Sequence, residues 1–507
     1  METDVYDVIV VGAGGSGLAA GCSAAQRGAS VLVLEKRPQP GGTTGIAVGS
    51  FTAAGTSMQR AKGIVDRPVD HAEDAAKFAD PVIESANHTE LRRYFLREAA
   101  ETLEWLRGMG VTFVGPSPEP PNRVPRMHNV VPGAKAYIAC LQLALRAAGG
   151  KLICNADVRS LERDGDRVAG VRVDVDGRCF TFRARRGVVL AAGDYANNPA
   201  LIAEFKGERF GEIEGINPFA GGDGHLLARQ VGARLVNMEV TYGPELRFVP
   251  SAKRPFRQAL PSRGLSAKLV GVLARRLPAW VIRRLVKRLL VTWQHPENAL
   301  FDDGAILINR HGERFVDETS WPEREIAVAA QPEKLAYILL DGRLIDRYSA
   351  WPHFISTAPD IAYAYVKDYR RLRPDVTHTG SDLRQVAAAA GIDSRRLAAT
   401  VAEVNTGRGE AGSRLERDPW VLLGPLKAWF TTTEGGVAIN ERLQVLDQRG
   451  DVIPGLYAVG QNGLGGMILW GHGLHIAWAM TSGRLVGQAV VPQSADTGSS
   501  PPGHPAE

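Results

Sequence analysis

The sequence predicts an α/β fold in two parts, in which a domain built on parallel strands is interrupted by an inserted α+β cap. At 507 residues the chain is too long for one compact core. Its start alternates short β-branched strands with helices, as in a parallel sheet that is buried on both faces. That style returns from about Phe430. We therefore expect one discontinuous domain over 1–246 and 425–491, and a cap over 247–424.

The first 35 residues form a βαβ unit. Val5 to Val11 is predicted as a strand, Ser16 to Gly28 as a helix and Ser30 to Glu35 as a second strand. The other elements expected in this domain are helices over 70–109 and 136–148, and strands over 151–161, 167–174, 186–192, 443–446 and 455–459. In the cap we expect a hairpin over 301–316 and mostly helices over 330–405.

A glycine-rich turn joins the first strand to the first helix and gives the motif GxGxxG. Gly12 permits the tight turn, Gly14 lets the backbone approach a pyrophosphate, and Gly17 lets the helix pack close to the strand. The pyrophosphate then lies at the helix N-terminus, where Gly15 and Ser16 are also expected to contact it. The motif therefore predicts a Rossmann-like dinucleotide-binding domain.

An acidic residue and a second glycine motif follow this turn. Glu35 ends the second strand about 20 residues after the glycines, where a carboxylate accepts hydrogen bonds from ribose hydroxyls. Lys36 is assigned to the same site. Gly42, Thr43 and Thr44 come within ten residues of the acid, where flavoproteins run the chain beneath the diphosphate and the isoalloxazine. This spacing favours FAD over NAD.

Segments further along the chain are consistent with FAD. The strand around Val158 is placed to meet an adenine edge. Ala192 and Gly193 close the strand over 186–192, and the segment ending at Gly460 is typical of the strand that closes on the ribitol. We therefore predict FAD as the cofactor. We expect no metal site, because the four cysteines are scattered without metal spacing.

Together these motifs resemble the fumarate reductase and 3-ketosteroid Δ1-dehydrogenase superfamily of flavoproteins. The resemblance covers about 1–245 and 425–490, with residues 309–318 inside the cap. Asp223 lies in a GDG element of that family, and residues 435–436 match its GG element. The resemblance implies a flavin domain with an inserted cap, and an active site that lies between them against the flavin.

The resemblance also places the start of the last helix at the cofactor. It implies that Gly473, Leu474 and Ile476 direct backbone N–H groups at the flavin pyrimidine, where a helix N-terminus stabilises negative charge. Some fumarate reductases attach FAD covalently through a histidine next to the glycine motif that follows the second strand. This chain has Thr43 and Thr44 there and no histidine, so its FAD is expected to be non-covalent. The sequence has no second glycine fingerprint and no CxxxxC motif, which argues against an NAD(P)H site and against a disulfide reductase.

Two departures from the family pattern concern the substrate. Dicarboxylate enzymes of this family use an arginine as proton donor shortly after the pair that corresponds to Asp317 and Glu318. Arg324 lies about two places late for that role; it is a candidate, with an ion pair to Glu323 or Glu325 as the alternative. The steroid branch uses a tyrosine near this place, and that tyrosine is missing.

Aromatic residues remain where the substrate is expected. Trp321 and Trp470 favour a flat, apolar substrate, although either could instead belong to a core. Such flavoenzymes exchange a hydride with a carbon β to a carbonyl, while a protein group moves the α-proton. Tyr242 is the first candidate for that group and His472 the second; the alternatives are a tyrosine packed at the hinge and a histidine bound to a turn.

Three functions are compatible with these residues. The first is oxidation or reduction of a carbon–carbon bond next to a carbonyl in a hydrophobic cyclic or steroid-like molecule. The second is reduction of small α,β-unsaturated acids such as fumarate or urocanate. The third is a membrane-bound flavoprotein that relays electrons to a partner. Each needs an external electron acceptor or donor, for which a quinone is one candidate.

The segment 251–293 carries many basic residues and no acid. Its second half has cations on one helical face and apolar residues on the other, which is typical of a helix at a membrane surface. The alternative is a cap helix packed on its own domain. The net charge of +5 does not suggest nucleic acid. No export signal precedes the first strand, so we expect a cytoplasmic protein. If the segment 251–293 binds the membrane, it does so on the inner face. We expect a disordered tail over 492–507.

Overall fold

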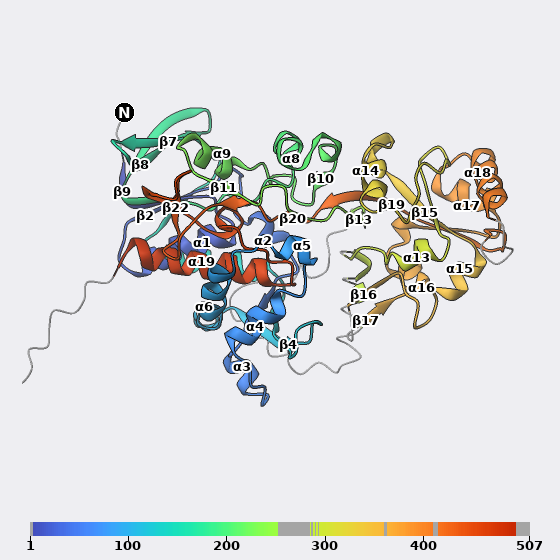
Figure 1. Ribbon diagram of the computed structural model, residues 1–507, viewed down its shortest axis with the longest axis horizontal. Helices are drawn as coiled ribbons and strands as arrows, with labels where there is room; N and C mark the ends of the chain where they lie inside the picture. The colour runs from blue at the N-terminus through green and yellow to red at the C-terminus, as the bar shows by residue number, and fades with distance from the viewer. Residues whose placement is uncertain are drawn as a thin grey trace, which may run out of the picture.

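The chain forms two lobes, each with its own buried apolar cluster. The computed structural model describes residues 4–251, 284, 287–288, 290–292, 294–358, 362–408 and 414–492. Figure 1 shows the two lobes side by side along the long axis of the molecule. We call them the sheet lobe, built on an eight-stranded sheet, and the cap, built on a six-stranded sheet.

The sheet lobe is built around five parallel strands. Their order is β23–β9–β1–β2–β6, with β22 antiparallel at the β23 edge. A β7–β8 hairpin extends the sheet from β9. This arrangement is an α/β fold in which the last strand of the chain lies two places from the first. The strands are β1 Val5–Val11, β2 Val31–Leu34, β6 Lys151–Ile153, β7 Ala156–Asp164, β8 Arg167–Val175, β9 Arg178–Leu190, β22 Gln444–Leu446 and β23 Val452–Ala458.

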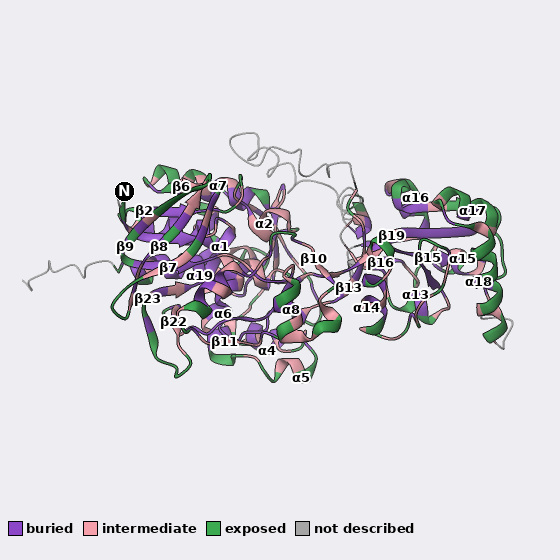
Figure 2. Cartoon of the chain, turned by 90° about the horizontal axis from the view of Figure 1, so that it is seen from above, coloured by how far each residue is buried: buried purple, intermediate pink, exposed green. Residues whose placement is uncertain are grey.

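Helices cover the faces of the central part of this sheet, where β2 and most of β1 are buried (Figure 2). The first helix α1, Gly15–Gln26, packs along the last helix α19, Leu474–Val490. Two glycines of α19 permit the close approach: a Cβ on Gly483 would lie 2.5 Å from the Ser16 carbonyl oxygen, and one on Gly487 would lie 2.5 Å from the Ser23 Cβ. The remaining large helices of this lobe are α6 Thr89–Gly108, α7 Lys135–Ala147, α8 Pro199–Lys206 and α9 Asp223–Gln230.

A small three-stranded sheet lies below the start of α19. It has the order β3–β5–β4, with β3 Ser50–Thr52, β4 Thr112–Ser117 and β5 Met127–Val131. Four short helices accompany it: α2 Gly42–Ile46, α3 Ser57–Arg60, α4 Pro68–Ala75 and α5 Pro81–Glu84.

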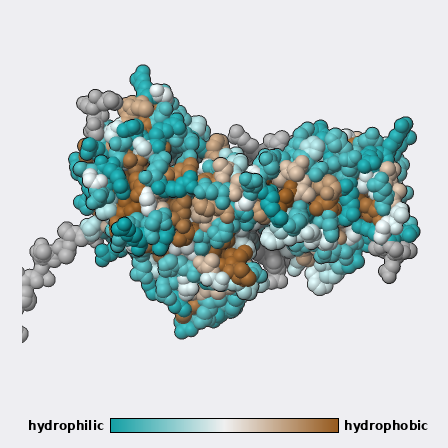
Figure 3. Space-filling view, turned by 45° about the horizontal axis from the view of Figure 1, so that its top comes forward, coloured by the Kyte–Doolittle hydropathy of each residue, from teal (hydrophilic) through white to brown (hydrophobic). Residues whose placement is uncertain are grey.

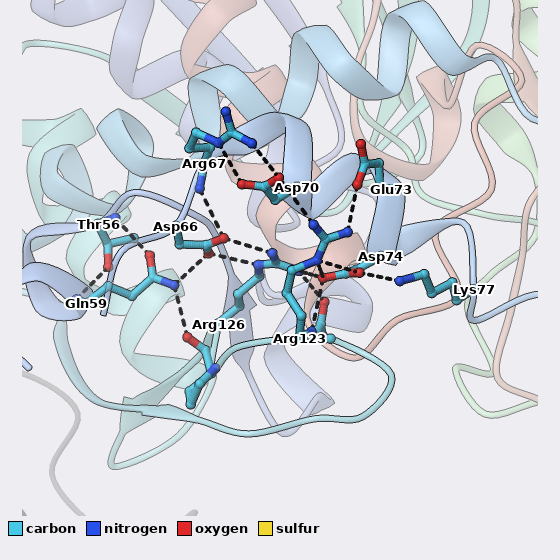
Figure 4. A network of polar contacts seen from close by, with 12 residues as sticks. Thr56, Gln59, Asp66, Arg67, Asp70, Glu73, Asp74, Lys77, Arg123 and Arg126 are labelled. Atoms are coloured by element: carbon cyan, nitrogen blue, oxygen red, sulfur yellow. Dashed lines mark hydrogen bonds and ion pairs between the residues drawn. The ribbon is translucent and has the colours of Figure 1, made fainter. Parts of the chain in front are cut away.

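A buried ion-pair network holds this small sheet to α4 (Figure 4). The fully buried Arg126 bonds Asp66 at 2.8 Å and Asp74 at 2.7 Å. The Arg123 Nε donates to the same Asp74 carboxylate at 3.0 Å, and Gln59 donates to Asp66 at 2.7 Å. Because every buried charge has an opposite charge or a hydrogen-bond partner, the network fixes β5 against α4 and the loop after α3.

The cap is a mixed sheet with helices around it. The long strand β19 lies at its centre and pairs with β10, β13, β15 and β18, while β14 pairs with β15. The strands are β10 Glu214–Gly215, β13 Glu245–Phe248, β14 Ile306–Ile308, β15 Ala336–Leu340, β18 Thr377–Gly380 and β19 Trp420–Phe430, with a separate hairpin of β16 Ser356–Ala358 and β17 Ala362–Ala364. Its helices are α13 Ala299–Asp302, α14 Glu323–Ala329, α15 Gly342–Arg347, α16 Val366–Leu372, α17 Leu383–Ala390 and α18 Ser394–Gly407.

Two adjacent chain segments connect the lobes, and we call them the crossing. The outgoing segment consists of β12, Thr241–Tyr242, followed by β13, and the returning segment consists of β19 followed by β20, Thr432–Thr433. β12 pairs with β20, and β13 pairs with β19, so the two segments run antiparallel side by side. Gly243 between β12 and β13 has φ +102°, a conformation that only glycine adopts readily.

The structure corrects three expected elements. The helix expected over 70–109 is three helices, because Pro81 lacks an N–H and starts a new helix that the Asp80 side chain caps. The hairpin expected over 301–316 is α13 followed by β14, and it closes only through an isolated bridge between Ile308 and Arg314. The region 330–405 contains four strands among its helices.

Most of the basic segment 251–293 lies outside the described residues, and so does the tail after residue 492. In the described remainder, Lys287 pairs with Asp368 at 2.9 Å, and Leu290 and Val291 are buried in the cap core. These contacts belong to a helix packed on its own lobe. Among the described residues, no helix combines the length and the apolarity needed to cross a membrane.

Replacing Asp74 by Asn should destabilise the protein by about 3 kcal/mol, because it removes one of the two carboxylates that pair with the buried Arg126. Burial would raise the pKa of Asp74, but hydrogen bonds from Lys77, Arg123 and Arg126 outweigh burial and lower that pKa well below its usual value. The stabilisation is therefore present above about pH 4, the pKa of an unfolded aspartate, and is lost as the pH falls below it.

Urea unfolding at pH 7 and at about pH 2.5 measures this effect, because the second pH lies between the pKa of the unfolded aspartate and that of the folded one. Asp70→Asn is the matched control, since Asp70 pairs with Arg67 and Arg123 nearer the surface and should cost less than about 1 kcal/mol. Equal losses in the two variants would contradict the assignment.

Candidate active site

The glycine motif brings β1, β9 and α1 into close contact. Gly12 has φ +103°, and a Cβ there would lie 2.5 Å from the Ala191 carbonyl oxygen at the end of β9. A Cβ on Gly17 would collide with the Gly12 carbonyl oxygen, so α1 lies directly against the loop. A Cβ on Gly15 would lie 2.6 Å from the Thr44 hydroxyl oxygen. The three glycines therefore leave no room for side chains at the mouth of α1.

No side chain caps the first turn of α1. The helix begins after Gly14 in extended conformation, and Gly15 and Ser16 are buried in its first turn. Uncapped N–H groups in a first turn bind phosphate oxygens. The backbone of α2 lies close by, since a Cβ on Gly42 would be 3.2 Å from the Gly14 Cα.

Glu35 and Lys36 lie beside this mouth. The Glu35 carboxylate accepts hydrogen bonds from the Ala13 N–H at 2.8 Å and the Arg37 N–H at 3.0 Å. The Lys36 ammonium pairs with Asp223 at 3.2 Å. It also lies 3.6 Å from Asp157, the neighbour of the buried Val158 on β7. The structure thus brings together Glu35, Lys36, Val158 and Asp223.

A loop before α9 closes over the same region, which the sequence did not reveal. Asn217 donates to the Thr43 hydroxyl at 2.9 Å, and the Arg37 guanidinium lies 3.8 Å from the centre of the Phe219 ring. Asp223 then starts α9 after Gly222, which has left-handed backbone.

The segment after β23 completes this surface. The Ala192 N–H donates to the Asn462 Oδ1 at 3.4 Å, and Gly193 has φ +82°. A Cβ on Gly460 would lie 2.5 Å from the Ser16 hydroxyl oxygen. The buried Asn462 Nδ2 has no hydrogen-bond partner among the described residues. An uncapped helix mouth, a buried acid at the end of the second strand and an unpartnered buried amide together fit a dinucleotide such as FAD.

The first turn of α19 is held in place by β3. Gly473 precedes the helix with φ +84°, and a Cβ on it would lie 2.7 Å from the Thr52 hydroxyl oxygen. That hydroxyl donates to the His472 carbonyl at 2.6 Å. Leu474 is buried, Ile476 is half-buried, and the first turn has no side-chain cap.

His472 forms a dyad with Glu119. A single Glu119 carboxylate oxygen lies 2.6 Å from the His472 Nδ1 and accepts from the His472 backbone N–H at 2.7 Å. Glu119 is buried in the β4–β5 connection, while 62% of the His472 side chain is exposed. The hydrogen bond to Glu119 raises the pKa of His472, so the ring holds its proton to higher pH than a free histidine.

Tyr242 and Trp470 form an aromatic pair near this dyad. Their rings pack edge to face with centres 5.5 Å apart. Burial raises the pKa of Tyr242, so the phenol stays protonated across the physiological range. The Glu245 carboxylate at the crossing is close enough to raise the pKa of both Tyr242 and His472, which places these groups in one neighbourhood.

Trp321 reaches the crossing from the cap. Its indole N–H donates to the Pro244 carbonyl at 3.1 Å, and the residue is 58% exposed. The candidate proton donor Arg324 lies inside the cap. It is buried, pairs with Glu325 at 2.6 Å, and lies 4.8 Å from the centre of the Phe301 ring. Arg324 also donates to the Glu318 carbonyl and to Asn298, so all of these hydrogen bonds are made to residues of the cap.

A buried polar network, which the sequence did not reveal, lies behind the first turn of α19. It contains Asp194, Thr432, Glu434, Gln461 and His475, which come from four separate segments of the chain. The one signal in the sequence is the presence of polar residues within glycine-rich apolar stretches, and that signal does not pair them.

Known proteins share both the sequence and the fold of this chain. Residues 7–470 match the family model described as "FAD binding domain". A fumarate reductase (cytochrome) of Shewanella frigidimarina is 27% identical, covering 97% of this chain and 78% of the relative. A urocanate reductase of Eggerthella lenta is 26% identical, covering 91% of this chain and 70% of the relative.

Solved structures agree. The open conformation of a flavocytochrome c3 fumarate reductase superposes with a TM-score of 0.70 at 25% identity, covering 96% of this chain and 78% of that one. A 3-ketosteroid Δ1-dehydrogenase from Sterolibacterium denitrificans shares the fold, with a TM-score of 0.63 at 19% identity over 97% of this chain and all of that one. The chain therefore belongs to the FAD binding domain family of FAD-dependent oxidoreductases, is similar in sequence to fumarate reductases, and shares its fold with a 3-ketosteroid dehydrogenase.

Proposed function

We propose that this FAD-dependent oxidoreductase acts on a carbon–carbon bond next to a carbonyl, in a hydrophobic cyclic or steroid-like substrate. The observation that carries the proposal is the aromatic pair of Tyr242 and Trp470 beside the His472–Glu119 dyad. An aromatic wall with a few placed polar groups suits a flat molecule with one carbonyl. The bound FAD supplies hydride exchange at its N5 atom.

The chain's own residues supply proton transfer and carbonyl binding. His472 holds and releases the proton of the carbon α to the carbonyl, and Glu119 keeps the ring oriented and charged. Tyr242 stays protonated, so it acts as a hydrogen-bond donor to the substrate carbonyl rather than as a base. Trp470 and Trp321 bound the space in which the substrate lies.

The placement of Arg324 supports a substrate without two carboxylates. Its guanidinium is buried and already donates to Glu325, which makes it less available as a proton donor or a carboxylate anchor. We therefore assign Arg324 to the cap, where it holds the start of α14 against Asn298 and Glu318.

A second candidate is the reduction of small α,β-unsaturated acids. Arg247 on β13 favours it, because its guanidinium lies at the crossing between Glu245 at 2.7 Å and the Thr431 hydroxyl at 3.2 Å. The similarity to fumarate and urocanate reductases points the same way. In both candidates the electron donor or acceptor is an external molecule, for which we propose a quinone or a partner protein, and the protein works in the cytoplasm.

Anaerobic stopped-flow mixing distinguishes the two candidates. Dithionite-reduced holoenzyme should regain its yellow absorbance on mixing with cyclohexenone or 4-androstene-3,17-dione, and should stay bleached with fumarate or urocanate. His472→Gln should slow the enone reaction about 100-fold or more, since it removes the proton-transfer group. Recovery with the acids alone would replace the first proposal by the second.

Glu119→Gln should move the alkaline limb of the pH–rate profile to lower pH. Glu119 raises the pKa of His472, so the reactive cation of the wild-type enzyme persists to higher pH, and it disappears earlier once that carboxylate is gone. The measurement is kcat/KM against pH for enone reduction. Glu73→Gln, at an exposed ion pair with Arg123, is the control and should leave the limb in place. If the alkaline limb of the pH–rate profile stayed in place in Glu119→Gln, His472 would not be the group that transfers the proton.

A further inference from the structure

A continuous chain of polar side chains runs from the crossing to the first turn of α19. The Thr432 hydroxyl donates to Asp194 at 2.7 Å, and the Gln461 Nε2 donates to that hydroxyl oxygen at 2.7 Å. The Gln461 Oε1 lies 2.8 Å from the His475 Nδ1, and the His475 Nε2 lies 2.9 Å from the Glu434 Oε1. Asp194, Thr432 and Glu434 are buried.

The contacts of Gln461 fix the protonation of one ring nitrogen. Its amide nitrogen lies 2.8 Å from the Thr433 carbonyl oxygen, which can only accept, so the amide orientation is determined. The Gln461 oxygen therefore faces the His475 Nδ1. Since that oxygen also only accepts, the Nδ1 carries a hydrogen.

The second ring nitrogen faces a carboxylate. The His475 Nε2 and the Glu434 Oε1 have no hydrogen-bond partner among the described residues, although they lie 2.9 Å apart. With Nδ1 protonated, a neutral ring would leave the Nε2 lone pair 2.9 Å from a buried carboxylate oxygen, and the two would repel each other. A proton on the ring nitrogen would turn this repulsion into an attraction between opposite charges.

The two partners differ in their access to the site. His475 is the second residue of α19, and 25% of its side chain is exposed, whereas the Glu434 side chain is fully buried behind it. Glu434 is held there because its other oxygen accepts from the Leu469 N–H at 3.0 Å. The protonated ring is thus the positive end of the pair, and it lies in the helix turn that stabilises negative charge on a bound cofactor.

We propose that His475 and Glu434 form a positioning pair that holds one proton at the first turn of α19 and raises the midpoint potential of the bound FAD. Reduction adds negative charge to the cofactor, so an ion pair whose positive end lies in this turn and whose negative end is buried further away favours the reduced state over the oxidised state. The proposal rests on FAD binding and does not depend on which substrate the enzyme uses.

Spectroelectrochemical titration of the holoenzyme at pH 7 tests the pair. In Glu434→Gln the carboxamide N–H can donate to the His475 Nε2, so the ring is neutral and the extra proton is lost. Reduced FAD should then be favoured about tenfold less, a shift of about 30 mV to more negative potential for a two-electron couple. His475→Asn should shift the potential in the same direction, and the double variant should not shift it further than the larger single effect.

A matched control distinguishes this role from a structural one. Thr481→Val alters another buried polar side chain of α19 whose hydroxyl has no partner among the described residues, and it should leave the potential unchanged. A merely structural pair would weaken the binding of oxidised and reduced FAD equally, and the potential would not move. An unchanged or more positive potential in Glu434→Gln overturns the proposal, and so does loss of FAD from both single variants, since the pair would then serve binding alone.

Discussion

The structure depends on the close approach of two helices to one glycine loop. Gly17 lets α1 pack against the carbonyl of Gly12. Gly483 lets α19 pack against α1, since a Cβ on Gly483 would lie only 2.5 Å from the Ser16 carbonyl oxygen. The loop, the first helix and the last helix therefore form one close-packed unit, in which a single methyl group would force a rearrangement. This unit sets the distance between the mouth of α1, where we expect the diphosphate, and the mouth of α19, where the proposed catalytic end lies.

The catalytic end is assembled at the crossing between the lobes. Tyr242 belongs to the outgoing segment and Thr432 to the returning segment, and their strands pair with each other. The cap adds Trp321, whose indole N–H reaches the Pro244 carbonyl. The Tyr242 ring packs on Trp470, two residues before His472, so the crossing and the start of α19 share one aromatic contact. A substrate at this place would contact both lobes.

Local signals predicted the first part of the fold well, because the βαβ unit is specified by adjacent residues. Val5–Val11 matches β1, and the predicted helix over 16–28 differs from α1 by at most two residues at either end. The cap was less predictable, since a short apolar run such as β15, 336–340, fits a strand or a buried helix equally well. The network around His475 was invisible, because its partners Gln461 and Glu434 lie 14 and 41 positions away and only the fold brings them together.

Buried carboxylates form a common feature of the site. Glu35, Glu119 and Glu434 each accept a hydrogen bond from a backbone N–H of a loop that shapes it: Ala13, His472 and Leu469 respectively. Two of these acids also face a histidine at the start of α19, where the helix dipole alone would disfavour a cation. The carboxylates offset that penalty, so protons can be held at a helix end that otherwise attracts only anions. An uncharged side chain at either position would remove the charge on which the proposed proton transfer at His472 and the proposed effect of His475 on the cofactor depend.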